Sequence, residues 1–175
     1  MDIYLRALEL EDNKILSKWR NDRKLTDKLG GNIFFVSTYR EKEWVEKAIE
    51  NDKRDLHLAI VKRENNTFIG MVNLTSIDHV NKKAEFSIFI GDKKQMGKGY
   101  GKQATNLILQ YAFNELNLNK VWLSVLKTNN KARKLYEIIG FKNDGVLRNN
   151  VYKNGSYHDF YLMSILKNEF IKNDV

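Results

Sequence analysis

The feature that most constrains this chain is a glycine-rich segment, residues 96–101 (MGKGYG). A strand-like run precedes it and an amphipathic helical pattern follows it. Glycine allows positive φ and a close approach of the backbone to a bulky anion, and the first N–H groups of the following helix face a negative charge. Lys98 and Lys102 add positive charge. The segment predicts a pyrophosphate-binding loop, with a glycine-rich turn that binds nothing as the alternative.

Two better-known phosphate-binding loops also place glycines between a strand and a helix, and neither fits. A Walker A loop has glycine five residues before a Gly-Lys-Ser/Thr end, whereas Gly101-Lys102 has Met96 at that position and Gln103 after it. The dinucleotide fingerprint is Gly-x-Gly-x-x-Gly in an opening strand–helix–strand unit. This chain has Gly-x-Gly-x-Gly more than halfway along, so both loops are excluded.

Size and composition narrow the class of protein. The chain has 175 residues, and we expect a single domain over residues 1–175. No apolar run approaches the roughly 20 residues that span a bilayer, and the N-terminus lacks a basic region followed by an apolar core. We therefore expect a cytoplasmic protein without a membrane partner. The absence of cysteine excludes disulfides, thiolate catalysis and cysteine-ligated zinc, and the scattered histidines lack metal-ligand spacing, so no metal is expected.

The net charge of +8 raises the question of a nucleic-acid partner. Clustered Lys and Arg are typical of proteins that bind phosphate backbones. Here the basic residues are spread along the chain, without a run of five or more and without an RNA-recognition signature. A lysine-rich solvated surface that also attracts an anionic cofactor is favoured over nucleic-acid binding.

Hydrophobic periodicity predicts strands and helices along the whole chain. The strands are expected at residues 3–7, 56–61, 68–77, 83–90, 121–125, 146–153 and 157–166. The helices are expected around residues 15–19, from 38 to 51–52, from 101 to 112 and from 129–130 to 139. Thr38 and Glu41 have the spacing of a capping box, Gly140 is typical of a helix C′ position, and Asn154-Gly155 predicts a hairpin turn.

Several motifs, in this order along nearly the whole chain, resemble the GNAT superfamily of acetyl-CoA-dependent N-acetyltransferases. The motifs are Leu5-Arg6-Ala7-Leu8, Trp19-Arg20-Asn21-Asp22, Ala84-Glu85-Phe86, the glycine loop, and Asn129-x-x-Ala132-x-x-Leu135-Tyr136 ending in Gly140-Phe141. The first two are most similar to the subgroup of ribosomal-protein N-terminal acetyltransferases and bacterial spermidine N-acetyltransferase. The resemblance implies an α/β (α+β) fold with a central, mostly antiparallel mixed sheet flanked by helices, in which strands 4 and 5 are splayed.

The resemblance also implies a site for the cosubstrate acetyl-CoA. Family loops usually read Gln/Arg-x-x-Gly-x-Gly/Ala, so Gly99 and Gly101 match, while Met96 departs from the pattern and Gln95 offers a partial replacement. The splayed strands leave a slot for the pantetheine arm, and a main-chain N–H near Phe89 would polarise the thioester carbonyl. The implied cofactor-binding residues are Ile88, Phe89, Ile90, Gln95, Met96, Gly97, Lys98, Gly99, Tyr100, Gly101, Lys102 and Asn129.

Tyr136 is the candidate general acid. Its spacing alone favours a core tyrosine on the apolar stripe of a helix. The pattern Asn129-x-x-Ala132-x-x-x-Tyr136 matches the family's position for the acid, and a phenol within hydrogen-bond reach can protonate the departing CoA thiolate. The resemblance therefore implies a catalytic role for this residue.

Glu85 is the candidate base or substrate ligand. An amine with a pKa of about 10 must lose a proton before it attacks, so some base is needed. Glu85 is the only carboxylate in residues 83–90 and lies on the strand face opposite Phe86 and Ile88. The alternative is a solvent-facing glutamate on an alternating strand.

The identity of the acceptor amine stays open. A polycation such as spermidine needs carboxylates, but few occur in residues 26–45. The charged residues there are Asp27, Glu41, Glu43, Lys28, Arg40 and Lys42. A small-molecule amine, an amino sugar or a peptide N-terminus is therefore at least as consistent with the sequence as spermidine. A lesser alternative is a non-catalytic CoA- or RNA-binding module, and a homodimer is common among similar proteins.

Overall fold

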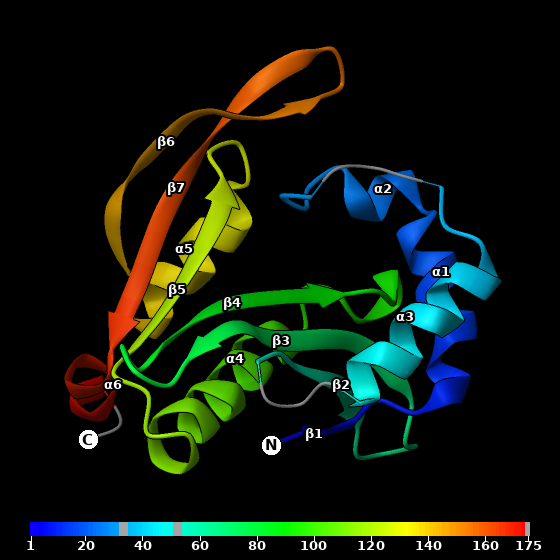
Figure 1. Ribbon diagram of the computed structural model, residues 1–175, viewed down its shortest axis with the longest axis horizontal. Coiled ribbons are helices and arrows are strands. Elements are labelled where there is room, and N and C mark those ends of the chain that lie inside the picture. Colours follow the sequence, from blue (N-terminus) through cyan, green and yellow to red (C-terminus); the bar gives the residue numbers. More distant parts are fainter. Residues whose placement is uncertain (32–34, 51–53, 174–175) are drawn as a thin grey trace.

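The computed structural model describes residues 1–31, 35–50 and 54–173. Its strands are β1 (Ile3–Ala7), β2 (Leu56–Lys62), β3 (Phe68–Asp78), β4 (Lys83–Ile90), β5 (Lys120–Leu126), β6 (Lys142–Lys153) and β7 (Ser156–Leu166). They form a seven-stranded sheet in the order β1-β2-β3-β4-β5-β7-β6 (Figure 1). Neighbouring strands are antiparallel except for β4 and β5, which are parallel. The mixed, mostly antiparallel sheet confirms the predicted fold class.

Helices lie between the strands, close to the predicted positions. They are α1 (Asn13–Arg20), α2 (Arg23–Thr26), α3 (Thr38–Glu50), α4 (Tyr100–Gln110), α5 (Asn130–Ile139) and α6 (Lys167–Asn173). Shorter turns are the 3-10 helices η1 (Leu10–Asp12) and η2 (Lys93–Gln95) and the π-helical η3 (Tyr111–Glu115). Within the described ranges, no helix combines the length and apolarity that crossing a membrane requires.

The capping box predicted at the start of α3 is wrong. Ser37, the residue before the helix, accepts a hydrogen bond from the Arg40 N–H on its Oγ at 3.1 Å. Glu41 instead is 1% exposed and forms an ion pair with Arg20 of α1, with Oε1 at 2.8 Å from Nε. This pair fixes α1 against α3, a tertiary demand that overrides the local signal. The predicted helix end at residues 51–52 lies outside the described residues.

Apolar side chains cover both faces of the sheet. On one face, Val72 of β3 packs in a cluster with Ile108 of α4. On the other, the neighbouring Met71 packs with Leu16 of α1 and Val45 of α3. Because successive residues of a strand point to opposite faces, alternate residues of β3 supply the two cores. The helices thereby hold the central strands between two layers (Figure 1).

The strands β4 and β5 form a fork. They share three residue pairs, from Lys83 opposite Lys120 to Glu85 opposite Trp122. Beyond Glu85 the two strands continue without pairing to each other and diverge (Figure 1). This confirms the predicted splay of strands 4 and 5. The fork leaves backbone N–H and C=O groups available for a ligand, because such groups need partners when they are buried.

The strands β6 and β7 form a long hairpin at the edge of the sheet. Asn154 and Gly155 close it with φ values of 50° and 84°, the two positive angles that a type I′ turn requires. The predicted hairpin turn is confirmed. Gly140, with φ of 115°, ends α5 as predicted. The strand β6 begins at Lys142, earlier than the sequence indicated, because it continues through bulges in its pairing with β7.

Candidate active site

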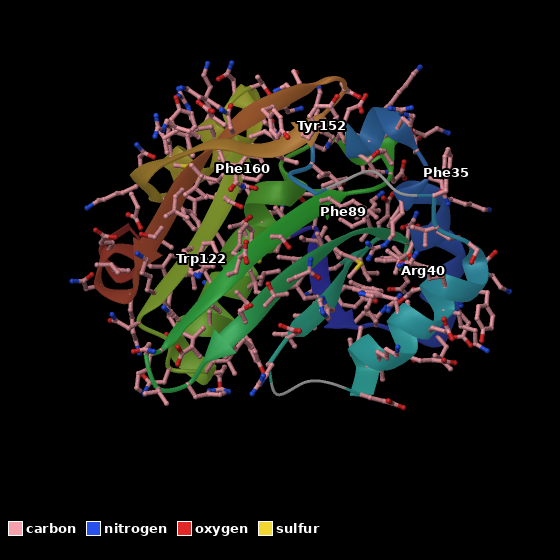
Figure 2. The ribbon with its side chains drawn as sticks, turned by 45° about the horizontal axis from the view of Figure 1, so that its top comes forward. Phe35, Arg40, Phe89, Trp122, Tyr152 and Phe160 are labelled. Atoms are coloured by element: carbon pink, nitrogen blue, oxygen red, sulfur yellow. The ribbon has the colours of Figure 1, made fainter. Side chains whose placement is uncertain are left out.

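A cavity of about 460 Å³ lies at the fork, and we call it the fork cavity. It contains the predicted site residues Glu85, Ile88, Phe89, Asn129 and Tyr136. The other lining residues are Lys28, Leu29, Gly30, Gly31, Asn73, Phe86, Ser87, Ser124, Val125, Leu126, Ala132 and Phe160. Phe89 and Phe160 line it from β4 and from β7, which lie on different sides of the fork (Figure 2). The fold thus brings both predicted catalytic side chains to one cavity.

Tyr136 lies in the wall of the fork cavity and is 8% exposed. Its ring packs edge-on against Phe86, with centroids 6.0 Å apart, and against Phe141 at 5.7 Å. Burial raises the pKa of Tyr136 to about 12, because the phenolate would lose its hydration. The hydroxyl is therefore protonated at neutral pH and can donate a proton into the cavity. The ring belongs to the core, as its spacing predicts, and the residue also lines the cavity; its role as the acid stays a prediction.

Glu85 stands at the vertex of the fork. It is the last residue of β4 that pairs with β5, opposite Trp122. Its side chain is half-buried, and within the described part of the chain its carboxylate has neither a hydrogen bond nor an ion pair. Desolvation by burial raises the pKa of Glu85 above its usual value. A half-buried, unpaired carboxylate in a cavity is placed to accept a proton rather than to solvate a surface.

The glycine loop lies past the end of β4, outside the fork cavity. Ile90 and residues 95–102 do not line that cavity. Gly97 and Gly99 adopt φ values of 79° and 85°, and Gly99 is the residue before α4. A Cβ on Gly99 would meet no atom of the described residues within 4 Å, so among them the space above it is open.

Gly101 differs from the other two glycines of the loop. It lies inside α4, and a Cβ there would be 3.5 Å from Cδ2 of Leu135, an ordinary van der Waals distance that the packing of α4 against α5 accommodates. At the front of the loop, Gln95 accepts a hydrogen bond from Lys98 Nζ at 3.2 Å. The ammonium of Lys131 lies near Gly97, since a Cβ on that glycine would be 3.8 Å from Nζ. Sequence reasoning missed Lys131, because α5 brings it there from a distant segment.

Asn129 is the N-cap of α5, one of the two positions, 129 and 130, at which the sequence predicts the helix to begin. Its Oδ1 accepts a hydrogen bond from the Ala132 N–H at 3.2 Å, and its Nδ2 donates to the carbonyl oxygen of Lys28 at 3.0 Å. The side chain thus connects α5 to the segment of residues 26–31, which we call the α2 loop. One N–H of the amide is left for a ligand in the fork cavity.

The α2 loop closes one side of the fork cavity, and a lysine that the sequence did not single out holds it. Lys153 at the end of β6 is 5% exposed. Its ammonium donates hydrogen bonds to the carbonyl oxygens of Thr26 at 2.7 Å, Leu29 at 2.5 Å and Gly31 at 3.3 Å. Burial lowers the pKa of Lys153 below its usual value, and the negative charge of Asp27 offsets only part of that effect. This side chain joins the hairpin β6–β7 to the α2 loop.

A second cavity of about 310 Å³ adjoins the first, and we call it the inner cavity. The two cavities share Leu29, Gly31, Asn73, Ser87 and Phe89. The inner cavity is also lined by Trp19, Arg20, Leu25, Thr26, Val36, Trp44, His57, Met71 and Thr75. It lies between the sheet and the helices α1 to α3, so its residues come from segments that no local motif connects.

A ladder of polar side chains crosses the sheet at the floor of the inner cavity. His57, Asn73 and Ser87 stand directly opposite one another on β2, β3 and β4. His57 Nδ1 is 2.9 Å from Asn73 Oδ1, and Asn73 Nδ2 donates to Ser87 Oγ at 3.0 Å. Polar residues at alternating strand positions were the available signal, but only the register of the strands aligns them.

Comparison with known proteins gives this arrangement its context. Residues 2–142 match the family described as acetyltransferase (GNAT) domain. The spermidine N(1)-acetyltransferase of Vibrio cholerae is 32% identical, over 95% of this chain and 94% of that protein. The putative ribosomal N-acetyltransferase YdaF of Bacillus subtilis is also 32% identical, over 96% of this chain and 93% of that protein.

The three-dimensional comparison agrees. The crystal structure of the Vibrio cholerae spermidine N-acetyltransferase in complex with CoA and spermine superposes with a TM-score of 0.90. That match has 31% sequence identity and covers 97% of this chain and 98% of the other. The family and fold implied by the sequence motifs are confirmed. The chain belongs to the GNAT family and is an N-acetyltransferase that uses acetyl-CoA.

Proposed function

We propose that this chain transfers an acetyl group directly to a primary amine in the fork cavity, with Glu85 and Tyr136 as the catalytic residues. The observation that carries this is the joint position of the two side chains. An unpaired carboxylate and a protonated phenol, from β4 and α5, line one cavity at the point where the strands part. Acetylation of an amine needs a base, which accepts a proton from the amine, and an acid, which donates a proton to the departing thiolate.

The fork and the glycine loop fit acetyl-CoA. Residues 88–90 pair with β3 but not with β5, so their edge that faces β5 offers hydrogen-bond partners for an extended pantetheine arm. The open space above Gly99, the first-turn N–H groups of α4, and the ammonium groups of Lys98 and Lys131 suit a pyrophosphate. Asn129 has one N–H for the arm. When bound, acetyl-CoA supplies an activated thioester carbonyl.

Glu85 accepts the proton that the amine must lose, directly or through one water. Its raised pKa brings the carboxylate closer to the operating pH, which favours proton acceptance and release. Tyr136 donates its hydroxyl proton to the sulfur that leaves, and its high pKa keeps that proton in place until then. A main-chain N–H near Phe89 donates to the oxygen that becomes negative during the attack.

The acceptor is a primary amine on a small molecule, an amino sugar or a peptide N-terminus. Spermidine is the second candidate, which the name of the Vibrio cholerae relative favours. The paucity of free carboxylates near the cavities favours the first. A cytoplasmic location, a homodimer and a single domain over residues 1–175 stay predictions.

The test is release of free CoA thiol from acetyl-CoA, followed with a thiol-reactive dye. Because the chain contains no cysteine, the protein itself contributes no thiol to the signal. The acceptors are spermidine, an amino sugar nucleotide, an aminoglycoside and a short peptide. Release with one class supports the proposal and identifies the acceptor group. Binding of acetyl-CoA without release by any amine contradicts it and favours a CoA-binding module.

A further inference from the structure

The two cavities adjoin along five shared lining residues, so together they extend from the proposed catalytic residues to the helices α1 and α3. Ser87 lines both cavities and follows Glu85 by two residues on the same face of β4, a separation of about 7 Å along a strand. An amine that reaches Glu85 from the inner side therefore has its substituent in the inner cavity. The chemistry of that cavity decides which amines fit.

Beside its polar residues, the inner cavity has an aromatic and aliphatic part. Trp19 is held by Phe68 and Phe89, with ring centroids 5.0 and 5.8 Å apart. Trp44 stands beside the ring of His57 at 5.1 Å. Together with the buried Met71, these rings offer a preformed apolar surface to a ring or a branched aliphatic group.

The charges in the two cavities oppose a polycation. Among the described residues that line them, Glu85 is the sole carboxylate, while Lys28 and Arg20 are positive. Glu41 is not available to pair with an ammonium of the acceptor, because it is 1% exposed and already paired with Arg20. A cation–π contact with Trp44 is also taken, since the guanidinium of Arg20 lies 4.5 Å from the centroid of its ring. A second ammonium on the acceptor would lie near Arg20 without a partner.

The polar ladder leaves one hydrogen-bond donor that a polar atom of the acceptor can use. Asn73 Oδ1 can only accept, so the hydrogen in its bond with His57 belongs to His57 Nδ1. Ser87 Oγ accepts from Asn73 Nδ2, which leaves the hydroxyl hydrogen of Ser87 to donate. A hydroxyl or carbonyl oxygen near the amine would satisfy it.

From these observations we propose that the acceptor is a primary monoamine that carries an aromatic or branched aliphatic group, which the inner cavity binds, and that polyamines are disfavoured. The inference rests on the proposed function, because it needs the reacting amine to lie at Glu85. It names the chemistry of the acceptor that the transferase proposal leaves open.

The test compares 2-phenylethylamine with spermidine and 1,4-diaminobutane in the thiol-release assay. We expect kcat/KM for 2-phenylethylamine to exceed that for either polycation by about tenfold or more. The inner cavity buries its ring, whereas a polycation leaves an ammonium there without a partner. Equal or higher values for spermidine overturn the inference and leave the transferase proposal intact.

Binding separates the two proposals. Isothermal titration of each amine into the protein with saturating CoA measures affinity without turnover. Tighter binding of 2-phenylethylamine without thiol release from acetyl-CoA supports the assignment of the inner cavity as an apolar amine site and contradicts the transferase proposal. Tighter binding of spermidine overturns the inference whatever the turnover.

A charge substitution sharpens the test. Val36 is half-buried at the inner cavity, and its backbone N–H and carbonyl hold their bonds to Asn21 whatever the side chain. Val36→Glu adds a carboxylate there, and we expect the preference for 2-phenylethylamine over spermidine to fall by about tenfold. The matched control is Val80→Glu, at a 90% exposed position outside both cavities, which should leave the ratio unchanged. An unchanged ratio in Val36→Glu overturns the assignment of the inner cavity.

Discussion

The contact between Lys153 and the α2 loop makes a quantitative prediction. Lys153→Met keeps an unbranched side chain of similar length and removes the ammonium. Three carbonyl oxygens, those of Thr26, Leu29 and Gly31, then lose their donor. Because these carbonyls belong to the loop beside both cavities, the variant tests whether the hairpin β6–β7 holds the acceptor side of the site closed.

The distances set the expected size of the effect. Bonds of 2.7 and 2.5 Å from an ammonium are strong, and the third at 3.3 Å is weak. Each strong bond to a charged group contributes about 1.5–3 kcal/mol, from which the cost of burying the ammonium is subtracted. The lowered pKa of Lys153 reports that cost. A net loss of about 2 kcal/mol follows, which corresponds to a roughly 30-fold increase in loop opening.

Two measurements separate a local effect from a global one. Amide hydrogen exchange reports opening of the α2 loop, and urea unfolding reports the free energy of the whole chain. We expect faster exchange confined to the loop and a higher KM for the acceptor amine, with a small change in the affinity for acetyl-CoA. The matched control is Lys142→Met on the same strand, where the side chain is 70% exposed and its pair with Glu169 is worth below about 1 kcal/mol. Unchanged loop exchange and KM in Lys153→Met would refute the reasoning.

Three further predictions concern the proposed catalytic residues and the glycine loop. Tyr136→Phe keeps the ring contacts with Phe86 and Phe141, so we expect an unfolding free energy within about 1 kcal/mol of the parent and a kcat lower by about 10²–10⁴-fold in thiol release. Activity should fall as pH drops through the raised pKa of Glu85, since the carboxylate must be charged to accept a proton; Tyr136, with a pKa of about 12, should cause no decline at neutral to moderately basic pH. A pH profile of kcat at saturating amine whose acid limb stays at the same pH in Glu85→Gln would contradict the first part. Gly99→Val should weaken acetyl-CoA binding at least about tenfold in calorimetry, whereas Gly155→Val, at a similar φ of 84° in an equally open place, should not.

The sequence predicted those parts of the fold that local signals define. The alternation over residues 83–90 specified a strand with Glu85 and Phe86 on opposite faces, and Asn154-Gly155 specified the hairpin turn. The splay of β4 and β5 was available only through the resemblance to a family. No local pattern says which neighbouring strands stop pairing.

The remaining site features depend on contacts between distant segments. Lys153 is one of many lysines in the sequence, and its role follows from the hairpin that carries it to the α2 loop. The ladder of His57, Asn73 and Ser87 needs the register of three strands. The local capping signal at Thr38 failed for a related reason, because Glu41 is recruited by a partner on another helix.

The fork between β4 and β5 also bears on how this protein can be improved or damaged. A sheet gains stability when adjacent strands complete their hydrogen bonds, and here two neighbours stop after three pairs. The binding slot therefore exists because the sheet lacks strand pairs that would have stabilised it. Substitutions selected only for stability would favour pairing of β4 and β5 along their whole length. The enzyme would then be more stable but would lose the slot for its cosubstrate.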